Sequence, residues 1–390
     1  MTSTFAVVLS GGGARGAYEA GVLSILLPAL DGLDMRPDLF VGTSAGAINA
    51  VGFASLHHLG AAASSAAVLD LWREVHAGSV FRPPLRATLG RLTGRGDGRR
   101  RAGGLLDTAP LTPTLERLVA WDQLHANVDK GITVGVGATA AATRDSTVFV
   151  ETRPGIRPPP RDDNRAITYV ATPLEARHVL ASSAIPVLFP AVEVQRPAAA
   201  SGWYFDGGVR LNTQIKPATA LGAERVLVVA TASADPPSAT RHSGASRPPG
   251  LAAGAAQLLY AMLDDRMVED LRTLAKRNEP VADGAVIPWL FGGPRRDHAG
   301  LLGRLVCEVL EGAGPAPRPW RGALSTLARR QAGRFLAEDP DRGEVVSYLF
   351  FDAEFIEGAI RLGRRDAERS LGPDGAPVWH EAGITAGSAG

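Results

Sequence analysis

The run Phe5-Ala-Val-Val-Leu-Ser-Gly-Gly-Gly-Ala-Arg-Gly16, near the start of the chain, decides the fold class. Its first five residues form an unbroken apolar stretch that ends at glycines, which is typical of a short strand buried on both faces of a parallel sheet. The glycines that follow permit a tight turn. Apolar residues then recur at helical spacing between Ala17 and Leu26, which predicts a helix directly after the turn.

The same order of elements is repeated at once. The stretch Asp38–Gly42 predicts a second strand, and the small residues from Ser44 to Phe53 predict a second helix. Strand, glycine turn and helix, twice in succession, indicate an α/β fold with a parallel sheet. We expect further strands over 132–136, 147–150 and 226–230, and further helices over 65–72, 111–119, 257–271 and 353–371.

Changes in composition along the chain predict its organisation. Stretches rich in glycine, proline or charge are typical of loops, and they lie at 89–104, 153–165 and 235–250. We expect a core domain over 5–230, a flexible loop over 231–250, a C-terminal helical region over 251–371 that packs on the core, and a loose tail over 372–390.

The overall composition argues against several classes of protein. Hydrophobic residues make up 45% of the 390 residues and charged residues 21%, which is ordinary for a globular protein. The formal net charge of +1 gives no global field that favours nucleic acid. Cys307 is the only cysteine, so no intrachain disulfide can form and a cysteine-based metal site is not expected. We expect no metal ion, no cofactor and no nucleic-acid partner.

No signal peptide or membrane span is predicted. The apolar run at 5–9 follows polar residues instead of a basic region, unlike a secretory signal. The longest apolar stretch, roughly 17–30, contains Glu19 and Pro28 and is too short to cross a bilayer. We expect a cytoplasmic or membrane-peripheral protein. Export by a route without a signal stays open, and the sequence carries no signature of the oligomeric state.

The glycine run from Gly11 to Gly16 is the first candidate site. Glycines let backbone N–H groups converge at a helix N-terminus, where they favour a negative charge. The same spacing serves the pyrophosphate of dinucleotides, but that use wants an acidic residue at the end of the second strand. Here Asp38 precedes that strand and Gly42 follows it, so nucleotide binding is the weaker interpretation.

The stretch Gly42-Thr-Ser-Ala-Gly46 is the second candidate site, a G-x-S-x-G motif between a predicted strand and a predicted helix. In that position the two glycines allow a sharp turn that exposes the serine hydroxyl. A glycine-rich turn without chemistry is the alternative. The placement between strand and helix favours Ser44 as a nucleophile.

The stretch Asp206-Gly207-Gly208 is the third candidate. A serine hydroxyl is too weakly acidic to attack an ester unaided, so it needs a base within hydrogen-bond reach. None of the eight histidines lies in an obvious catalytic loop, and His380 is the one that stays open. An Asp-Gly-Gly stretch alone is usually only a turn.

Taken in order, these three motifs resemble the patatin-like phospholipase family, bacterial type. Two further stretches extend the resemblance, Ala181-Ser-Ser-Ala-Ile-Pro186 and Asp206-Gly-Gly-Val-Arg-Leu-Asn212. The resemblance covers about residues 5–230. It implies a three-layer fold with a mainly parallel central sheet flanked by helices, and it suggests that Pro186 shapes the wall near the nucleophile.

The resemblance also implies roles for single residues. Ser44 is the nucleophile and Asp206 its base, in a Ser–Asp dyad without histidine. Arg15 lies beside the oxyanion loop, either for charge support or to anchor that loop. The resemblance assigns the oxyanion hole to Gly11, Gly12 and Gly13, and the motif glycines are Gly16, Gly42, Gly46, Gly207 and Gly208. Such a dyad predicts a pH–rate profile without an essential group near the ordinary histidine pKa of about 6.5.

The resemblance implies a serine-dependent lipid acyl hydrolase that cleaves phospholipid, lysophospholipid or acylglycerol esters through an acyl-enzyme. The expected partners are the lipid ester and, transiently, a membrane surface. The alternatives are a catalytically silent lipid-binding or regulatory protein with the same fold, a nucleotide-binding module, and a hydrolase with His380 as base. Leu188, Phe189 and the apolar face of 257–271 are candidates for contact with the acyl chain, and core packing is the simpler interpretation of them. A basic cluster is a candidate for contact with lipid head groups, and a solvated loop is its simpler interpretation. The cluster consists of Arg91, Arg95, Arg99, Arg100 and Arg101.

Overall fold

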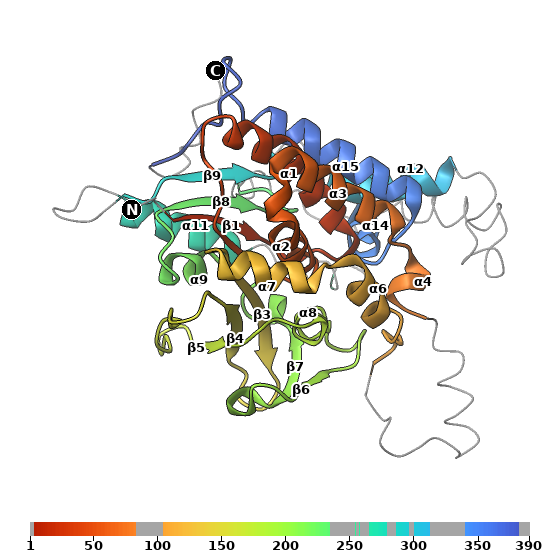
Figure 1. Ribbon diagram of the computed structural model, residues 1–390. Coiled ribbons are helices and arrows are strands. Elements are labelled where there is room, and N and C mark those ends of the chain that lie inside the picture. The colour runs from red at the N-terminus through yellow and green to blue at the C-terminus, as the bar shows by residue number, and fades with distance from the viewer. Residues whose placement is uncertain are drawn as a thin grey trace, which may run out of the picture.

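The computed structural model describes residues 4–82, 104–234, 254, 257, 265–278, 286–295, 300–312 and 340–381. Its centre is a sheet in the order β5-β4-β3-β2-β1-β8-β9, with β7 paired to β3 and β6 paired to β7 (Figure 1). The strands are β1 (Phe5–Leu9), β2 (Leu39–Thr43), β3 (Thr133–Ala140), β4 (Ser146–Glu151), β5 (Ile167–Ala171), β6 (Val192–Val194), β7 (Gly202–Asp206), β8 (Arg225–Val229) and β9 (Trp289–Gly292).

The middle of the sheet is parallel. Strands β3, β2, β1, β8 and β9 run in one direction, and only β4 and β7 pair with β3 in the antiparallel sense. All five residues of β1 and of β2 are buried, because helices cover both faces of the sheet. Continuous apolar strands of this kind are typical of a doubly covered parallel sheet.

Helices form the two outer layers (Figure 1). Because side chains alternate along a strand, Val7 and Leu9 face the core shared with α1, α2, α3 and α15, while Ala6 and Val8 face α9 and α11. The helices are α1 (Gly16–Asp31), α2 (Ala45–Leu56), α3 (Ala61–Glu74), α4 (Ala77–Val80), α6 (Leu111–Leu118), α7 (Trp121–Asp129), α8 (Ala176–Ser182), α9 (Ile215–Ala220), α11 (Asp265–Arg277), α12 (Leu301–Glu311), α14 (Pro340–Ser347) and α15 (Ala353–Glu368).

Helix α15 packs against α1 at very short range. A Cβ atom on Gly363 would lie 2.1 Å from the carbonyl oxygen of Tyr18, and one on Gly21 would lie 2.4 Å from that of Ile360. A glycine on each helix therefore allows the two backbones to touch. The hydroxyl of Tyr18 donates to Asp366 Oδ2 at 2.8 Å, which adds a buried polar contact to the same interface.

The predicted three-layer α/β fold is confirmed, and the predicted strands and helices of the first 230 residues are found within a few residues of their expected bounds. The short strands β5, β6 and β7, and the edge strand β9, were not predicted. Of the predicted helix at 257–271, the described part belongs to α11, which continues to Arg277. The remainder of that stretch, residue 257 apart, lies outside the described residues.

The predicted loops have different outcomes. Residues 153–165 carry no helix or strand, apart from a single bridge between Asp162 and Ile167. The stretches 89–103 and 235–250 lie outside the described residues, and so does the basic arginine cluster. In the described part of the predicted tail, residues 372–381, His380 exchanges two backbone hydrogen bonds with Trp289 of β9, at 2.7 and 2.9 Å. Within the described residues, no helix has the length and apolar character needed to cross a membrane.

Candidate active site

Ser44 occupies a sharp turn between β2 and α2. Its backbone has φ +54° and ψ −122°. This left-handed conformation is energetically unfavourable for any residue other than glycine, and such residues are concentrated at functional sites. The flanking glycines are required by close packing. A Cβ on Gly42 would lie 2.2 Å from the carbonyl oxygen of Gly46, and one on Gly46 would lie 2.5 Å from that of Leu9. The turn therefore holds the serine at the N-terminus of α2.

A second serine fixes this turn to the sheet. The backbone N–H of Ser44 donates to Ser182 Oγ at 2.8 Å, and that hydroxyl donates onward to the carbonyl oxygen of Gly137 in β3 at 2.5 Å. Ser182 belongs to the Ala181–Pro186 stretch, to which the sequence assigned no role beyond the wall formed by Pro186. The structure shows that one function of this stretch is to hold the turn.

Asp206 ends β7, where the strand pairs with β3 opposite Ala138. Its backbone oxygen accepts from Thr139 Oγ1 at 2.9 Å, and its Oδ1 accepts from the backbone N–H of Gly208 at 2.7 Å. Burial raises the pKa of Asp206 to about 7, while hydrogen bonds from the Gly208 backbone and the Ser44 side chain act in the opposite direction. The carboxyl is therefore beside the serine and titrates near neutrality.

The glycine loop after β1 offers backbone donors beside Ser44. A Cβ on Gly11 would lie 3.2 Å from the Cβ of Ser44, so the loop directly adjoins the nucleophile. The N–H of Gly11 itself donates to Asn212 Oδ1 at 2.9 Å. Among the described residues, the N–H groups of Gly12 and Gly13 have no acceptor. Of the three predicted oxyanion-hole glycines, these two carry the free donors.

Arg15 is directed away from the nucleophile. Its Nε donates to Ser347 Oγ at 2.7 Å, its Nη2 donates to the carbonyl oxygen of Glu344 at 2.8 Å, and it forms a buried ion pair with the Glu344 carboxylate. Its guanidinium also stacks on Tyr348, 3.9 Å from the ring centroid. Of the two roles considered for Arg15, the geometry fits anchoring of the loop to the C-terminal segment.

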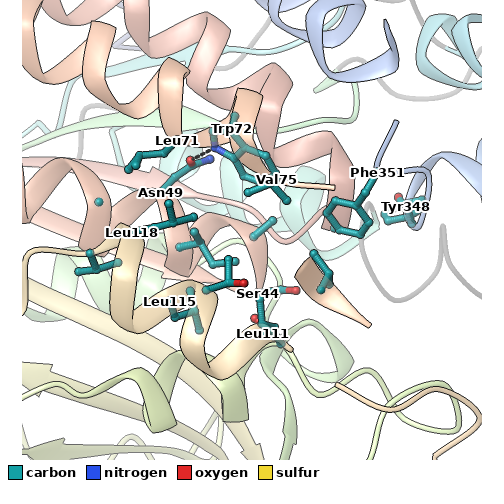
Figure 2. Close-up of a pocket in the computed structure, with 18 of the residues that line it drawn as sticks. Ser44, Asn49, Leu71, Trp72, Val75, Leu111, Leu115, Leu118, Tyr348 and Phe351 are labelled. Atoms are coloured by element: carbon teal, nitrogen blue, oxygen red, sulfur yellow. Dashed lines mark hydrogen bonds between the residues drawn. The ribbon is translucent and has the colours of Figure 1, made fainter. Parts of the chain in front are cut away.

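An apolar pocket opens beside Ser44 (Figure 2). Its walls come from one face of α2, from α3 and from α6. Two further stretches contribute Ser183, Ile185 and Phe189, and Tyr348, Leu349 and Phe351. The labelled side chains Leu71, Val75, Leu111, Leu115 and Leu118 all contribute hydrocarbon to the lining, and Leu111 and Leu115 are drawn nearest to Ser44 (Figure 2). The lining next to the nucleophile is therefore almost entirely apolar.

The family model for the patatin-like phospholipases matches residues 7–219. The chain belongs to this family. Membership supports, in general terms, the function of a lipid acyl hydrolase. The search of curated proteins found no match.

Among solved structures, the crystal structure of VipD from Legionella pneumophila is similar at 14% sequence identity and a TM-score of 0.29. The similarity covers 87% of this chain and 67% of that one. At these values the likeness carries no inference about activity.

The position of His380 in this patatin-like chain argues against His380 as the base for Ser44. Its hydrogen-bond partner Trp289 in β9 pairs with Val226 of β8, which pairs with Ala6 of β1, which pairs with Leu39 of β2. Trp289 and Leu39 are therefore at the same height in the sheet. Ser44 lies five residues beyond Leu39, so it is about 16 Å farther along the strand direction, and three strand spacings of about 4.8 Å also intervene. No described histidine lines the pocket beside Ser44.

The apolar wall also differs in part from the sequence hypothesis. Phe189 lines the pocket, whereas Leu188 and the described part of α11 do not. Helix α11 instead packs on the opposite face of the sheet, where Met267 and Leu271 contact its core. The simpler interpretation, core packing, is therefore correct for the described part of that helix. Among the described residues, no group of three or more His, Cys, Asp and Glu side chains is placed to hold a metal ion.

Proposed function

We propose that the chain is a serine-dependent lipid acyl hydrolase that works through an acyl-enzyme on Ser44, with Asp206 as base. One observation carries the proposal. Ser44 lies between a buried carboxyl whose pKa is about 7 and a pocket with an apolar lining. A general base is most effective when its pKa lies near the working pH.

In the first half-reaction, Ser44 Oγ attacks the ester carbonyl carbon while its proton passes to Asp206. The Gly208 N–H holds Oδ1, which leaves Oδ2 to accept that proton. Collapse of the tetrahedral intermediate breaks the bond to the alcohol, and the protonated Asp206 returns the proton to the leaving oxygen. The acyl group then remains on Ser44 as an ester.

The developing oxyanion requires donors that are already in place. The free N–H groups of Gly12 and Gly13 fit this role, and the N-terminus of α2 beside Ser44 adds a favourable dipole. Loss of one donor of this kind typically costs about 10²–10³ in kcat. Gly11 supports the loop indirectly, since its own N–H is held by Asn212.

In the second half-reaction, water replaces the alcohol. Asp206 removes a proton from the water as the water oxygen attacks the acyl carbon, and the bond to Ser44 Oγ breaks. The proton then passes from Asp206 to Ser44, and the fatty acid leaves. The dyad returns to its starting state without a histidine.

The chemistry of the pocket supports a fatty acyl ester as substrate. Each methylene buried from water contributes about 0.8 kcal/mol, so a lined apolar pocket favours acyl chains over small polar acids. Phospholipid, lysophospholipid and acylglycerol all present such a chain. Such substrates reside in membranes or micelles, so the proposal includes transient contact with a lipid surface.

Hydrolysis of defined phospholipids, lysophospholipids and monoacylglycerols tests the proposal. We expect fatty acid release by the wild type, a loss of about 10⁴-fold or more in Ser44→Ala, and a loss of about 10²–10⁴-fold in Asp206→Asn. His380→Ala is the control and should retain wild-type rates. A wild-type protein that binds these lipids and releases no fatty acid would instead favour the catalytically silent alternative.

A further inference from the structure

The apolar pocket follows one face of α2, starting at the nucleophile. Ser44, Ala45, Ile48, Asn49 and Gly52 all line it, and these positions share one side of a helix. Gly52 is the last residue of α2 that lines the pocket. It lies eight residues from Ser44, about 12 Å along the helix at about 1.5 Å per residue.

Gly52 differs from the other glycines of this region. A Cβ on Gly46 would lie 2.5 Å from backbone oxygens, so that position excludes any side chain. A Cβ on Gly52 would meet only Val68 Cγ2, at 3.8 Å, which is ordinary van der Waals contact. A glycine in a helix interior is less stable than an alanine, and close packing does not require one here. The missing side chain instead leaves open space in the pocket.

Helix α3 faces Gly52 across this space. Val68 and Trp72 of α3 line the same pocket. Trp72 is held in place by its Nε1, which donates to Asn49 Oδ1 at 2.7 Å (Figure 2). The part of the pocket farthest along α2 from Ser44 is therefore bounded by the fixed Trp72 ring, by the Val68 side chain and by the backbone of Gly52.

We propose that Gly52, together with Val68, sets the longest acyl chain that the pocket accepts, so that the preferred substrates are esters of medium-chain acids. This inference rests on the proposed acyl hydrolase function. An acyl group on Ser44 that follows α2 reaches Gly52 after a length close to that of a decanoyl chain. Longer chains must leave the pocket or displace its wall.

Initial rates on p-nitrophenyl butyrate, octanoate, decanoate, laurate and palmitate test this proposal. The wild type should have its highest kcat/KM on octanoate or decanoate. We compare kcat/KM on laurate with kcat/KM on butyrate. In Gly52→Leu this laurate-to-butyrate ratio should fall by about 10- to 200-fold, which is the range seen for small volume changes in an apolar pocket. Val68→Ala should move the optimum toward laurate, because it removes volume from the same end.

Ala62→Leu is the matched control, because it adds the same side chain on the exposed side of α3 and should leave the ratio unchanged. Gly52→Ala adds only a methyl group and suits helix geometry, so it replaces Gly52→Leu if the larger variant does not fold. Folded Gly52 and Val68 variants that keep the wild-type chain-length profile would overturn the proposal.

Binding separates this proposal from the catalytic one. Octanoate, decanoate and palmitate are added to Ser44→Ala and to Ser44→Ala/Gly52→Leu, and thermal stabilisation is measured. Preferential loss of decanoate stabilisation in the double variant supports the role of Gly52 even if no ester is hydrolysed. Equal stabilisation of the two proteins by each acid would contradict it. A wild type that hydrolyses none of the esters contradicts the proposed function alone.

Discussion

Asn212 holds Gly11 through both ends of its side-chain amide. Its Oδ1 accepts the N–H of Gly11 at 2.9 Å, and its Nδ2 donates to the carbonyl oxygen of Gly11 at 3.3 Å. The two residues are 201 positions apart. This clamp joins the glycine loop after β1 to the segment that follows Asp206. It therefore fixes the proposed oxyanion donors in position relative to the proposed base.

Removal of the clamp should reduce turnover. We expect Asn212→Ala to lower kcat about tenfold or more, with a smaller change in KM, because the free donors of the loop lose their position relative to Ser44. Asn278→Ala is a matched control, since Asn278 makes the same two-bond clamp on Ile287 away from the site. Each variant should lose about 1–3 kcal/mol of stability, measured by urea unfolding. Equal losses of kcat in both would contradict a positioning role.

The pH dependence of kcat/KM should follow Asp206. Because burial raises the pKa of its carboxyl to about 7 and the base must be deprotonated, kcat/KM should rise about tenfold per pH unit below this value and level off above it. The sequence alone predicted no essential group with a pKa near the histidine value of about 6.5. The burial of Asp206 changes that expectation, because it raises the pKa of the proposed base to about 7.

Temperature separates a carboxyl from an imidazole in this profile. Carboxyl ionisation has a small enthalpy, so the inflection should move little between cold and warm assays, whereas a histidine inflection would shift clearly. A strongly temperature-dependent inflection that disappears in one histidine variant would contradict the dyad.

The parts of the site that the sequence predicted are local. Ser44, Gly42 and Gly46 form one turn, and the physical reason for each residue lies within a few positions of it. Ser182 and Asn212 act on that turn or on the glycine loop from 138 and 201 residues away. Their roles depend on which strands become neighbours, and hydropathy does not encode that pairing.

The C-terminal contribution to the site was hidden for the same reason. Tyr348 and Phe351 line the pocket, and the carbonyl oxygen of Tyr348 accepts the N–H of Ala14 at 2.9 Å. The sequence predicted that region to pack on the core and assigned it no side chain at the site. The edge strand β9 was missed because a run of only four residues carries too little periodicity to be recognised.

Glu19 should make stability fall as pH rises. Burial raises the pKa of its carboxyl to about 8, whereas the unfolded chain has an ordinary value of about 4.3. Between these values the folded protein holds a proton that the unfolded chain lacks, so the unfolding free energy decreases with pH and the contribution is lost through about pH 8. In Glu19→Gln that part of the dependence should disappear.

Urea unfolding at about pH 5 and about pH 9 measures the effect, and the wild type should lose several kcal/mol more than Glu19→Gln over that window. The neutral amide can replace the protonated acid between its partners Ser10 and Asn49, each 3.0 Å away. Glu116→Gln, at an exposed position of α6, is the control. Parallel losses in wild type and Glu19→Gln would contradict a buried neutral carboxyl.

The buried pair Arg15–Glu344 should couple the glycine loop to the C-terminal segment. Removal of one partner leaves an uncompensated charge, so Arg15→Met and Glu344→Gln should each destabilise the protein by about 3–5 kcal/mol. The double variant should lose less than the sum of the two, which a double-mutant cycle in urea detects. The solvent-exposed pair Arg117–Glu74, taken through the same cycle, should show coupling below about 1 kcal/mol. Strict additivity at Arg15 and Glu344 would contradict the anchoring role.

The most direct test of the dyad is covalent labelling with an alkyl fluorophosphonate, followed by intact mass and peptide mapping. One adduct per chain is expected, on Ser44, with none in Ser44→Ala. The labelling rate should fall about 10²-fold or more in Asp206→Asn and stay at the wild-type value in His380→Ala. An adduct on another residue, or wild-type labelling of Asp206→Asn, would contradict a mechanism in which Asp206 activates Ser44.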